Sequence, residues 1–100
     1  YQDSVRKSRR GQAKADLIEA TQAMERHYTV AGSYTSATLP FARSPQTGTA
    51  HYNLSFETAP SSSQFKIRAV PVGTQARDAC GTLSVDYRGK KLPADSVCWQ

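Results

Sequence analysis

The first thirty residues carry apolar side chains at the spacing of an amphipathic helix. A stripe at i, i+3, i+4 and i+7 positions is formed by Ala13, Leu17, Ala20, Met24 and Tyr28. Toward the N-terminus the same face carries Arg6 and Arg10, so only the second half of the helix has an apolar side. The sequence predicts one long helix from Tyr1 that ends at Ala31–Gly32, where glycine supplies a left-handed cap residue.

The start of this helix lacks the residues that usually begin one. Ser4 is followed three residues later by Lys7, where a capping box has Glu or Gln. The cations at Arg6, Lys7, Arg9 and Arg10 would also lie near the positive end of the helix dipole. We therefore expect the native helix to start further upstream, and the chain to be a fragment of a longer protein.

Alternating apolar and polar residues in the second half predict three short strands, at 51–57, 64–70 and 82–87. The residues expected to face inward are Tyr52, Leu54, Phe56, Phe65, Ile67, Ala69, Leu83, Val85 and Tyr87. The tail, 92–100, offers a short edge strand. This order predicts an α+β fold, with one long N-terminal helix packed on an antiparallel sheet of three to four strands.

A chain of 100 residues fits one globular domain, and its 38% hydrophobic content excludes a disordered chain. No apolar run reaches the length of a membrane span. Tyr34, Leu39 and Phe41 are the expected anchors of the loop that follows the helix. We expect a protruding half-helix at 1–12, a packed half at 13–31, a helix-to-sheet loop at 32–50, and a sheet with a disulfide-bounded region at 51–100.

The two cysteines, Cys80 and Cys98, allow one pairing. No third cysteine or nearby histidine suggests a metal site. In a small domain without other covalent links we favour a disulfide over free thiols, with a contribution of about 3 kcal/mol. Such a bond indicates the periplasm or the extracellular space.

The net charge of +5 is concentrated in the first part of the helix. Residues 1–14 hold five basic groups and one acidic group, whereas residues 15–100 hold eight basic and seven acidic groups. A solvated helix face, or a basic segment beside a membrane-embedded stretch, explains this excess as well as DNA binding does.

Catalytic residues are not indicated. His27 borders the apolar stripe, His51 begins a strand on its polar face, and no hydrolase or metalloprotease motif accompanies them. Asp16 and Glu19, three positions apart, are typical of a solvated helix face. We expect no enzymatic activity, no cofactor and no metal.

Both ends of the chain resemble the type IV pilins, and most closely the minor pilins. The opening YQDSVRKSRRGQAKADLIEATQAMERHYTVAGSYT is similar to the stretch after the apolar N-terminal segment of these subunits. The segment ACGTLSVDYRGKKLPADSVCW, from Ala79 to Trp99, is similar to their C-terminal disulfide-bounded region. The resemblance implies a pilin-like fold and an upstream apolar helix, which a prepilin peptidase processes and which anchors in the inner membrane before packing in the fibre.

The function that this resemblance implies first is that of a structural minor subunit, which assembles into or primes the fibre through its N-terminal helix. Its partners would be other pilins, major and minor, and the inner-membrane assembly machinery. Its location would be the inner membrane facing the periplasm, then the extracellular fibre; methylation, cell adhesion and twitching motility are implied as well. Candidate subunit contacts are Ile18, on the flank of the stripe, and Ala15, on the far side from it.

Two alternatives remain: a pseudopilin of type II secretion, and a DNA-binding pilin that acts as receptor in natural transformation. Candidate DNA contacts are Arg43 in the long loop and, around the disulfide region, Arg77, Arg88, Lys90 and Lys91. These residues would form a basic stripe for phosphate contacts if the two regions adjoin in space. Because Asp78, Asp86 and Asp95 are interleaved among them, we favour subunit assembly over DNA binding.

Overall fold

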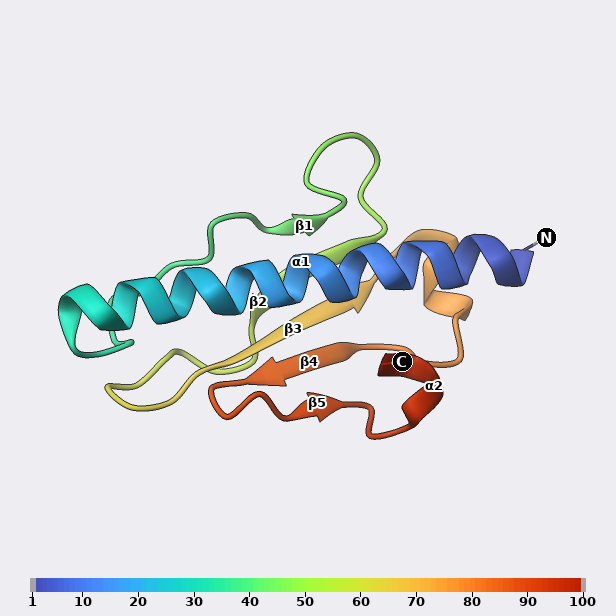
Figure 1. Ribbon diagram of the computed structural model, residues 1–100. Coiled ribbons are helices and arrows are strands. Elements are labelled where there is room, and N and C mark those ends of the chain that lie inside the picture. Colours follow the sequence, from blue (N-terminus) through green and yellow to red (C-terminus); the bar gives the residue numbers. More distant parts are fainter. Residues whose placement is uncertain (1, 100) are drawn as a thin grey trace.

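The computed structural model describes residues 2–99, so Tyr1 and Gln100, the ends of the predicted helix and tail, lie outside the described residues. The long helix α1 (Gln2–Ala31) lies across one face of a five-stranded antiparallel sheet in the order β1-β2-β3-β4-β5 (Figure 1). The remaining elements are β1 (Arg43–Ser44), β2 (Tyr52–Phe56), β3 (Lys66–Pro71), the 3-10 helix η1 (Gly73–Arg77), β4 (Leu83–Asp86), β5 (Lys91–Leu92) and α2 (Ser96–Trp99).

The predicted α+β fold is confirmed, and the sheet has more strands than expected. The additional strand is β1, which lies in the predicted helix-to-sheet loop and pairs Arg43 with Asn53 and Ser44 with Tyr52. An edge strand was expected in the tail at 92–100; the edge strand is instead β5 at Lys91–Leu92, which pairs with β4, and the tail forms the short helix α2. Both edge strands have only two residues, too few for a pattern of alternation to show in the sequence.

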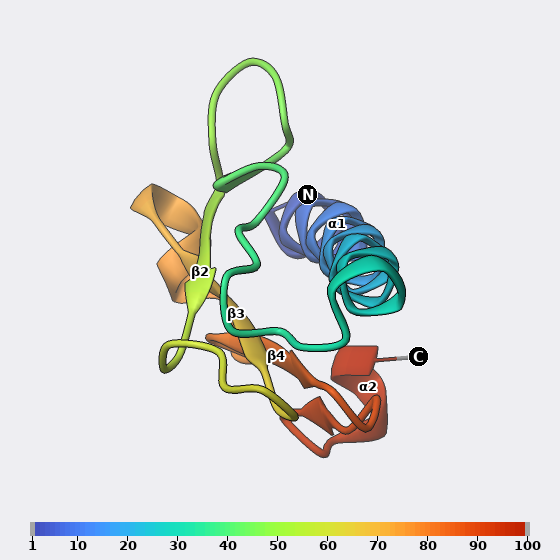
Figure 2. The ribbon, with the colours of Figure 1, turned by 90° about the vertical axis from the view of Figure 1, so that its left-hand side faces the viewer.

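The core lies between α1 and the face of the sheet that it covers, as the end-on view shows (Figure 2). Four of the predicted stripe residues are fully buried: Ala13, Leu17, Ala20 and Met24. The fifth, Tyr28, was expected to be packed, but it is 41% exposed because it lies near the end of the helix. Its ring is tilted against that of Tyr34, with 4.7 Å between the ring centroids. Tyr34 is buried, and Leu39 and Phe41 pack against the core, which confirms these loop anchors.

The packed side of α1 reaches further toward the N-terminus than the apolar stripe indicates. Arg10 is 7% exposed, and its Nη1 lies 2.7 Å from Oδ1 of Asp78. Gln75, in η1, is fully buried and donates from Nε2 to the carbonyl oxygen of Arg6 (3.0 Å) and to Oη of Tyr52 (2.9 Å). The segment 73–78 therefore covers a part of α1 that was expected to protrude. An arginine can lie on the packed face because an ion pair satisfies its charge.

Asp16 is also buried, at 2% exposed, which corrects the expectation of a solvated face. Its Oδ1 accepts hydrogen bonds from the amides of Gln12 and Gln46, both at 3.2 Å. Gln46 also donates to Oε2 of Glu19 at 3.3 Å. The connection between β1 and β2 is thereby attached to α1, and the donated hydrogen bonds compensate part of the cost of burying the carboxylate.

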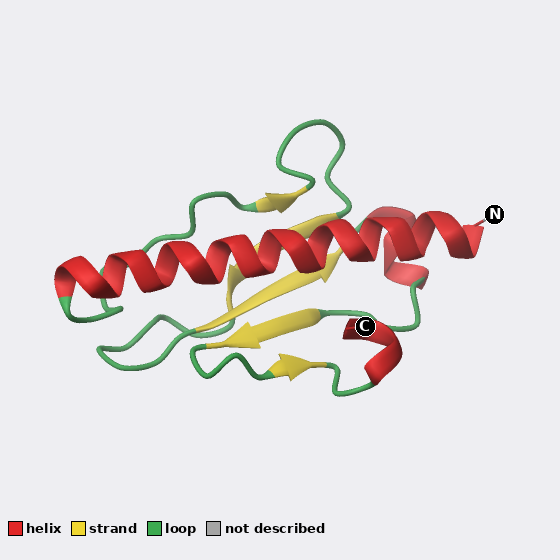
Figure 3. Cartoon of the chain, in the orientation of Figure 1, coloured by secondary structure: helices red, strands yellow, loops and turns green. Residues whose placement is uncertain are grey.

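The predicted end of the helix and the predicted disulfide are both confirmed. Gly32 has a φ of 73°, and its N–H donates to the carbonyl of Tyr28 at 2.7 Å. Cys80 and Cys98 form a disulfide. It joins the segment before β4 to α2, two parts of the chain that lie at the same end of the sheet (Figure 3). Within residues 2–99 no helix combines the length and the apolarity needed to cross a bilayer.

Tyr34 gives the fold a testable dependence on alkaline pH. Burial, and to a smaller extent the hydrogen bond to Glu25, raises the pKa of Tyr34 to about 12. The unfolded chain loses this proton near pH 10, at the usual pKa of about 10, whereas the folded chain keeps it. We expect the free energy of unfolding to fall as pH rises from about 10 to about 12, and Tyr34→Phe to remove this part of the fall. Chemical denaturation at several pH values checks this; an identical pH profile in the variant would contradict it.

Candidate nucleic-acid interface

The hairpin formed by β4 and β5 brings several basic residues to one end of the sheet. The turn is closed by the N–H of Asp86 donating to the carbonyl of Lys90 (3.1 Å) and by the N–H of Gly89 donating to that of Asp86 (2.9 Å). Gly89 has a φ of 80°, a conformation that glycine adopts without strain. We call the exposed residues of this region, together with the partly buried Trp99, the hairpin surface; it consists of Tyr87, Arg88, Lys90, Lys91 and Trp99.

The carboxylate of Asp86 is bound within the turn. Its Oδ1 accepts the backbone N–H groups of Arg88 and Lys90, both at 2.9 Å, and its Oδ2 lies 3.2 Å from Nη2 of Arg88. Burial alone would raise the pKa of Asp86, but these hydrogen bonds and the Arg88 charge outweigh it and lower the pKa. The acidic residue thus holds the turn together and orients Arg88, while Lys90 and Lys91 stay exposed.

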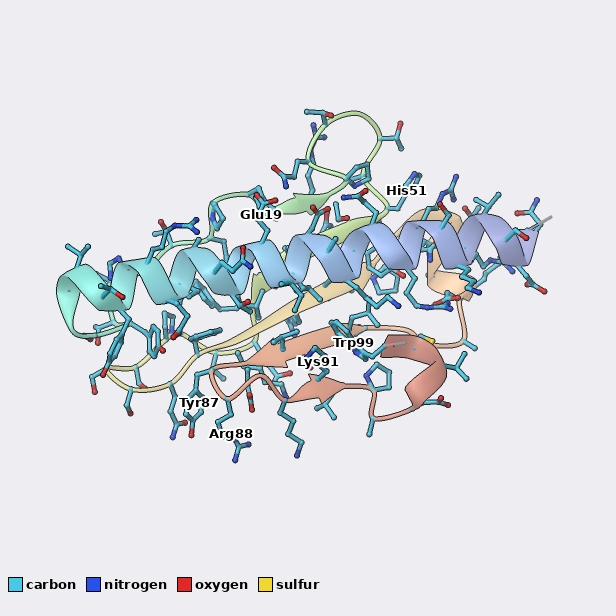
Figure 4. The ribbon with its side chains drawn as sticks, viewed as in Figure 1. Glu19, His51, Tyr87, Arg88, Lys91 and Trp99 are labelled. Atoms are coloured by element: carbon cyan, nitrogen blue, oxygen red, sulfur yellow. A yellow bond between two sulfur atoms is a disulfide. The ribbon has the colours of Figure 1, made fainter. Side chains whose placement is uncertain are left out.

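Two aromatic side chains lie beside the cations of the hairpin surface (Figure 4). The guanidinium carbon of Arg88 lies 5.6 Å from the ring centroid of Tyr87, and Nζ of Lys91 lies 5.9 Å from that of Trp99. Trp99 is held in place by donating from Nε1 to the carbonyl of Leu92 at 2.9 Å, and the neighbouring Cys98 is in the disulfide. Cations interleaved with aromatic rings are typical of surfaces that bind nucleic acids.

A cleft lies on each side of Tyr87 and Arg88. One, of about 490 Å³, separates them from the connection between β2 and β3. The other, of about 280 Å³, lies between the hairpin and α1 and has Ile18 and Glu25 on the helix side. The tip of the hairpin therefore stands between two depressions rather than on a flat surface.

A second basic region lies at the other end of α1, around a cleft of about 330 Å³ between the helix and the residues after η1. We call Arg6, Lys7 and Arg77, which line this cleft, the helix–η1 cluster. Arg6 lies 3.5 Å from Asp3, and Asp78 binds Arg10 within the same cleft. Arg9, on the same helix, contributes to lowering the pKa of His51, after the larger effect of burial.

The five predicted DNA contacts do not form one stripe. Arg88, Lys90 and Lys91 come together on the hairpin. Arg77 lies in η1, near the opposite end of the sheet (Figure 1). Arg43 lies on β1, at the opposite edge of the sheet from β5, and β2, β3 and β4 separate the two. Because adjacent strands are about 4.8 Å apart, Arg43 and Lys91 cannot adjoin.

The two predicted subunit contacts differ in exposure. Ala15 is exposed, on the side of α1 that faces away from the sheet. Ile18 is partly buried and packs against the core, at the side of the cleft between α1 and the hairpin. Ile18 therefore has a structural role, whereas Ala15 lies on a free helix face.

The aromatic part of the hairpin surface was not identified from the sequence. Tyr87 was expected to face the core, but it is 37% exposed because it follows the last residue of β4. The sequence signal that could have found it is the run YRGKK, in which an aromatic residue directly precedes a turn with three cations. Among residues 2–99 no group of three His, Cys, Asp or Glu side chains is placed to hold a metal ion.

Comparison with known proteins agrees with this architecture. Residues 1–84 match the family model described as type IV minor pilin ComP, DNA uptake sequence receptor. The solved structure of a type IV pilin from Shewanella oneidensis is 34% identical, with a TM-score of 0.72 over 95% of this chain and 98% of that chain.

The non-core minor pilin PilV of Neisseria meningitidis shares the fold at 19% identity, with a TM-score of 0.70 over 89% of this chain and 86% of that chain. Comparison with curated proteins yields no significant match. The family match over most of the chain, together with the structural match at 34% identity, shows that this chain belongs to the type IV minor pilins.

Proposed function

We propose that this minor pilin binds DNA during natural transformation, and that the hairpin surface makes the contacts. The description of the matching family, a DNA uptake sequence receptor, supports the activity. The observation that carries the location is the cluster of Arg88, Lys90 and Lys91, whose adjacent carboxylate, Asp86, is bound within the turn. The carboxylate across the smaller cleft, Glu25, accepts the hydrogen bond of the Tyr34 hydroxyl. Positive charge on this surface is therefore available to phosphates, the usual source of affinity in DNA binding.

The helix–η1 cluster is the competing location, and two observations favour the hairpin over it. In the helix–η1 cluster Arg6 lies beside Asp3, and a second carboxylate, Asp78, lines the same cleft. The hairpin combines its cations with two exposed or partly exposed rings, whereas among residues 2–99 no such ring lines the cleft of the cluster. The family match ends at residue 84, so the hairpin contacts are proposed from this chain's own residues.

The charge-removal variant Lys90→Ala/Lys91→Ala tests this location. We expect its affinity for a labelled duplex to fall about tenfold at low salt, and the slope of log affinity against log salt to decrease by about 2. Fluorescence anisotropy over a series of salt concentrations measures both quantities. Arg88 is left in place because it also bonds to Asp86 and holds the turn.

The matched control is Lys7→Ala/Arg77→Ala, which removes the same charge from the helix–η1 cluster. We expect this variant to keep the wild-type salt slope. Loss of binding in the control alone would move the DNA site to the helix–η1 cluster, and equal small losses in both variants would show only a general charge effect.

We also propose assembly into the pilus through the free face of α1, with pilin subunits and the inner-membrane assembly machinery as partners. The observation that favours it is that Ser8, Gly11 and Ala15 are exposed small residues on α1. In this proposal residues 1–100 act as one pilin-like domain, which faces the periplasm at the inner membrane before it joins the extracellular fibre.

Ala15→Glu tests the assembly proposal. Because Ala15 is exposed, we expect the melting temperature of the domain to change by no more than about 2 °C, while incorporation into sheared filaments falls severalfold. Quantitative mass spectrometry of the filaments measures incorporation. Wild-type incorporation would exclude this helix face as a contact.

A further inference from the structure

The larger cleft beside the hairpin surface is an open, polar depression with the volume of a small-molecule site. Its volume of about 490 Å³ lies within the range of roughly 300–1,000 Å³ that is typical of ligand pockets. The connection between β2 and β3 contributes Thr58, Ser61 and Gln64 to its lining, and the ends of β3 and β4 contribute Lys66, Tyr87 and Arg88. Hydrogen-bonding groups therefore face cations and an aromatic residue across one depression.

The polar side chains of this cleft are only partly used within the protein. The side-chain amide of Gln64 and the hydroxyl of Tyr87 make no hydrogen bond to any residue among 2–99. Lys66 is paired with Glu57 at 3.1 Å, and Asp86 is bound by the turn. The cleft thus presents a free amide and a free hydroxyl beside the Arg88 cation.

The exposed ring of Tyr87 bears on which form of DNA this surface can bind. Tyr87 is 37% exposed, and among residues 2–99 only Arg88 makes a cation–ring contact with it. In a duplex the faces of the bases are stacked on each other and hidden from a protein ring, whereas in a single strand they are free to stack on an aromatic side chain. Duplex phosphates are bound by the cations, whereas stacking of a base on the ring of Tyr87 requires an unpaired strand.

We propose that the cleft and the hairpin surface together bind single-stranded DNA, with one unstacked base against Tyr87 and its flanking phosphates on Arg88 and Lys90. The amide of Gln64 is within the same cleft and supplies the donor and acceptor that a base edge requires. This inference rests on the proposed function, because both use the cations of the hairpin.

The test compares Tyr87→Leu with Tyr87→Phe on three labelled ligands: a short single strand, an abasic strand of the same length, and a duplex. Phenylalanine keeps the ring, and leucine keeps apolar volume without it. We expect Tyr87→Leu to weaken binding of the base-bearing strand about tenfold, and Tyr87→Phe to stay within about twofold of wild type. Binding of the abasic strand should be unchanged in both variants, and any loss for the duplex should be smaller than the loss for the base-bearing strand.

Gln64→Ala provides a second variant at an exposed position, in case Tyr87→Leu disturbs the fold. It should weaken the base-bearing strand about threefold and leave the abasic strand unaffected. Wild-type binding of the base-bearing strand by both Tyr87→Leu and Gln64→Ala would overturn the inference, as would equal losses for all three ligands.

These outcomes can be separated from those of the proposed function. If Lys90→Ala/Lys91→Ala weakens duplex binding while the Tyr87 variants all bind the single strand equally, the proposed function stands and the single-strand site is wrong. If Tyr87→Leu loses the base-bearing strand while the double lysine variant leaves duplex binding unchanged, the single-strand site stands and the duplex function at this surface fails.

Discussion

Replacing Asp78 with alanine is expected to lower the free energy of unfolding by about 3–5 kcal/mol. The Asp78 carboxylate lies 2.7 Å from the guanidinium of Arg10, and the two side chains are only 8% and 9% exposed. Nε of Arg10 already lacks a hydrogen-bond partner, so removal of Asp78 leaves a buried charge with nothing to compensate it. Urea denaturation followed by circular dichroism measures the loss.

A double variant separates the cost of an unpaired charge from the net contribution of the pair. Arg10→Met/Asp78→Ala removes both charges, and we expect it to recover most of the stability that Asp78→Ala loses, since an apolar side chain can replace a buried pair at little cost. A loss below about 1 kcal/mol in the single variant would mean that the Arg10 charge is solvated, and that the ion pair does not attach the residues after η1 to α1.

Removing the disulfide with Cys80→Ser/Cys98→Ser is expected to lower the free energy of unfolding by about 3 kcal/mol. The bond closes a loop in the unfolded chain and thereby reduces the conformational entropy of that state. The two cysteines are 18 residues apart, and the loop that they close contains the whole hairpin. The tail after β5 has little packing to replace the bond: Val97 is 63% exposed, and Trp99 is only partly buried.

The disulfide variant should also bind DNA more weakly, because Trp99 and its contact with Lys91 are next to Cys98. Denaturation of the oxidised wild type, the reduced wild type and the serine variant compares stability, and amide exchange locates the change. We expect reduction and substitution to lower the free energy of unfolding by similar amounts. The backbone amides that pair β2 with β3 should stay protected from exchange in the native state. Unchanged stability in both would show that packing alone holds the tail.

The elements with local sequence signals were predicted correctly. Ala13, Leu17, Ala20 and Met24 face the core because helical periodicity alone determines which residues share a side. The inward residues of β2, β3 and β4 follow from alternation, and Gly32 ends α1 as its conformational freedom predicts. The disulfide followed from the cysteine count.

The features that depend on distant segments were not predicted. Arg10 was placed on the face of the apolar stripe, but its partner Asp78 is 68 positions away, so nothing local in the sequence indicates that this part of the face is covered. Gln75 is fully buried because η1 folds onto α1, and Asp16 is buried because Gln46 reaches it from a connection thirty residues away. In each case a tertiary hydrogen bond compensates for burial that the residue type disfavours.

Only part of the candidate site was predicted, because some of its residues are neighbours in the sequence and others are brought to it from distant segments. Arg88, Lys90 and Lys91 are neighbours in sequence and remain neighbours in the hairpin, whereas strand order separates Arg43 from them. Trp99 joins the surface through a contact with Lys91 that the sequence does not reveal. The negative charge of Asp86 in the sequence was an argument against DNA binding. In the structure this carboxylate accepts hydrogen bonds from the backbone N–H groups of the turn.

The most direct test of the account is a titration of the isotope-labelled chain with duplex DNA, followed by two-dimensional NMR at low salt. We predict that shift changes concentrate at residues 87–91 and at the indole N–H of Trp99, and that they disappear in Lys90→Ala/Lys91→Ala. Changes confined to the helix–η1 cluster or to the connection between β1 and β2, or no change at all, would contradict DNA binding by the hairpin surface.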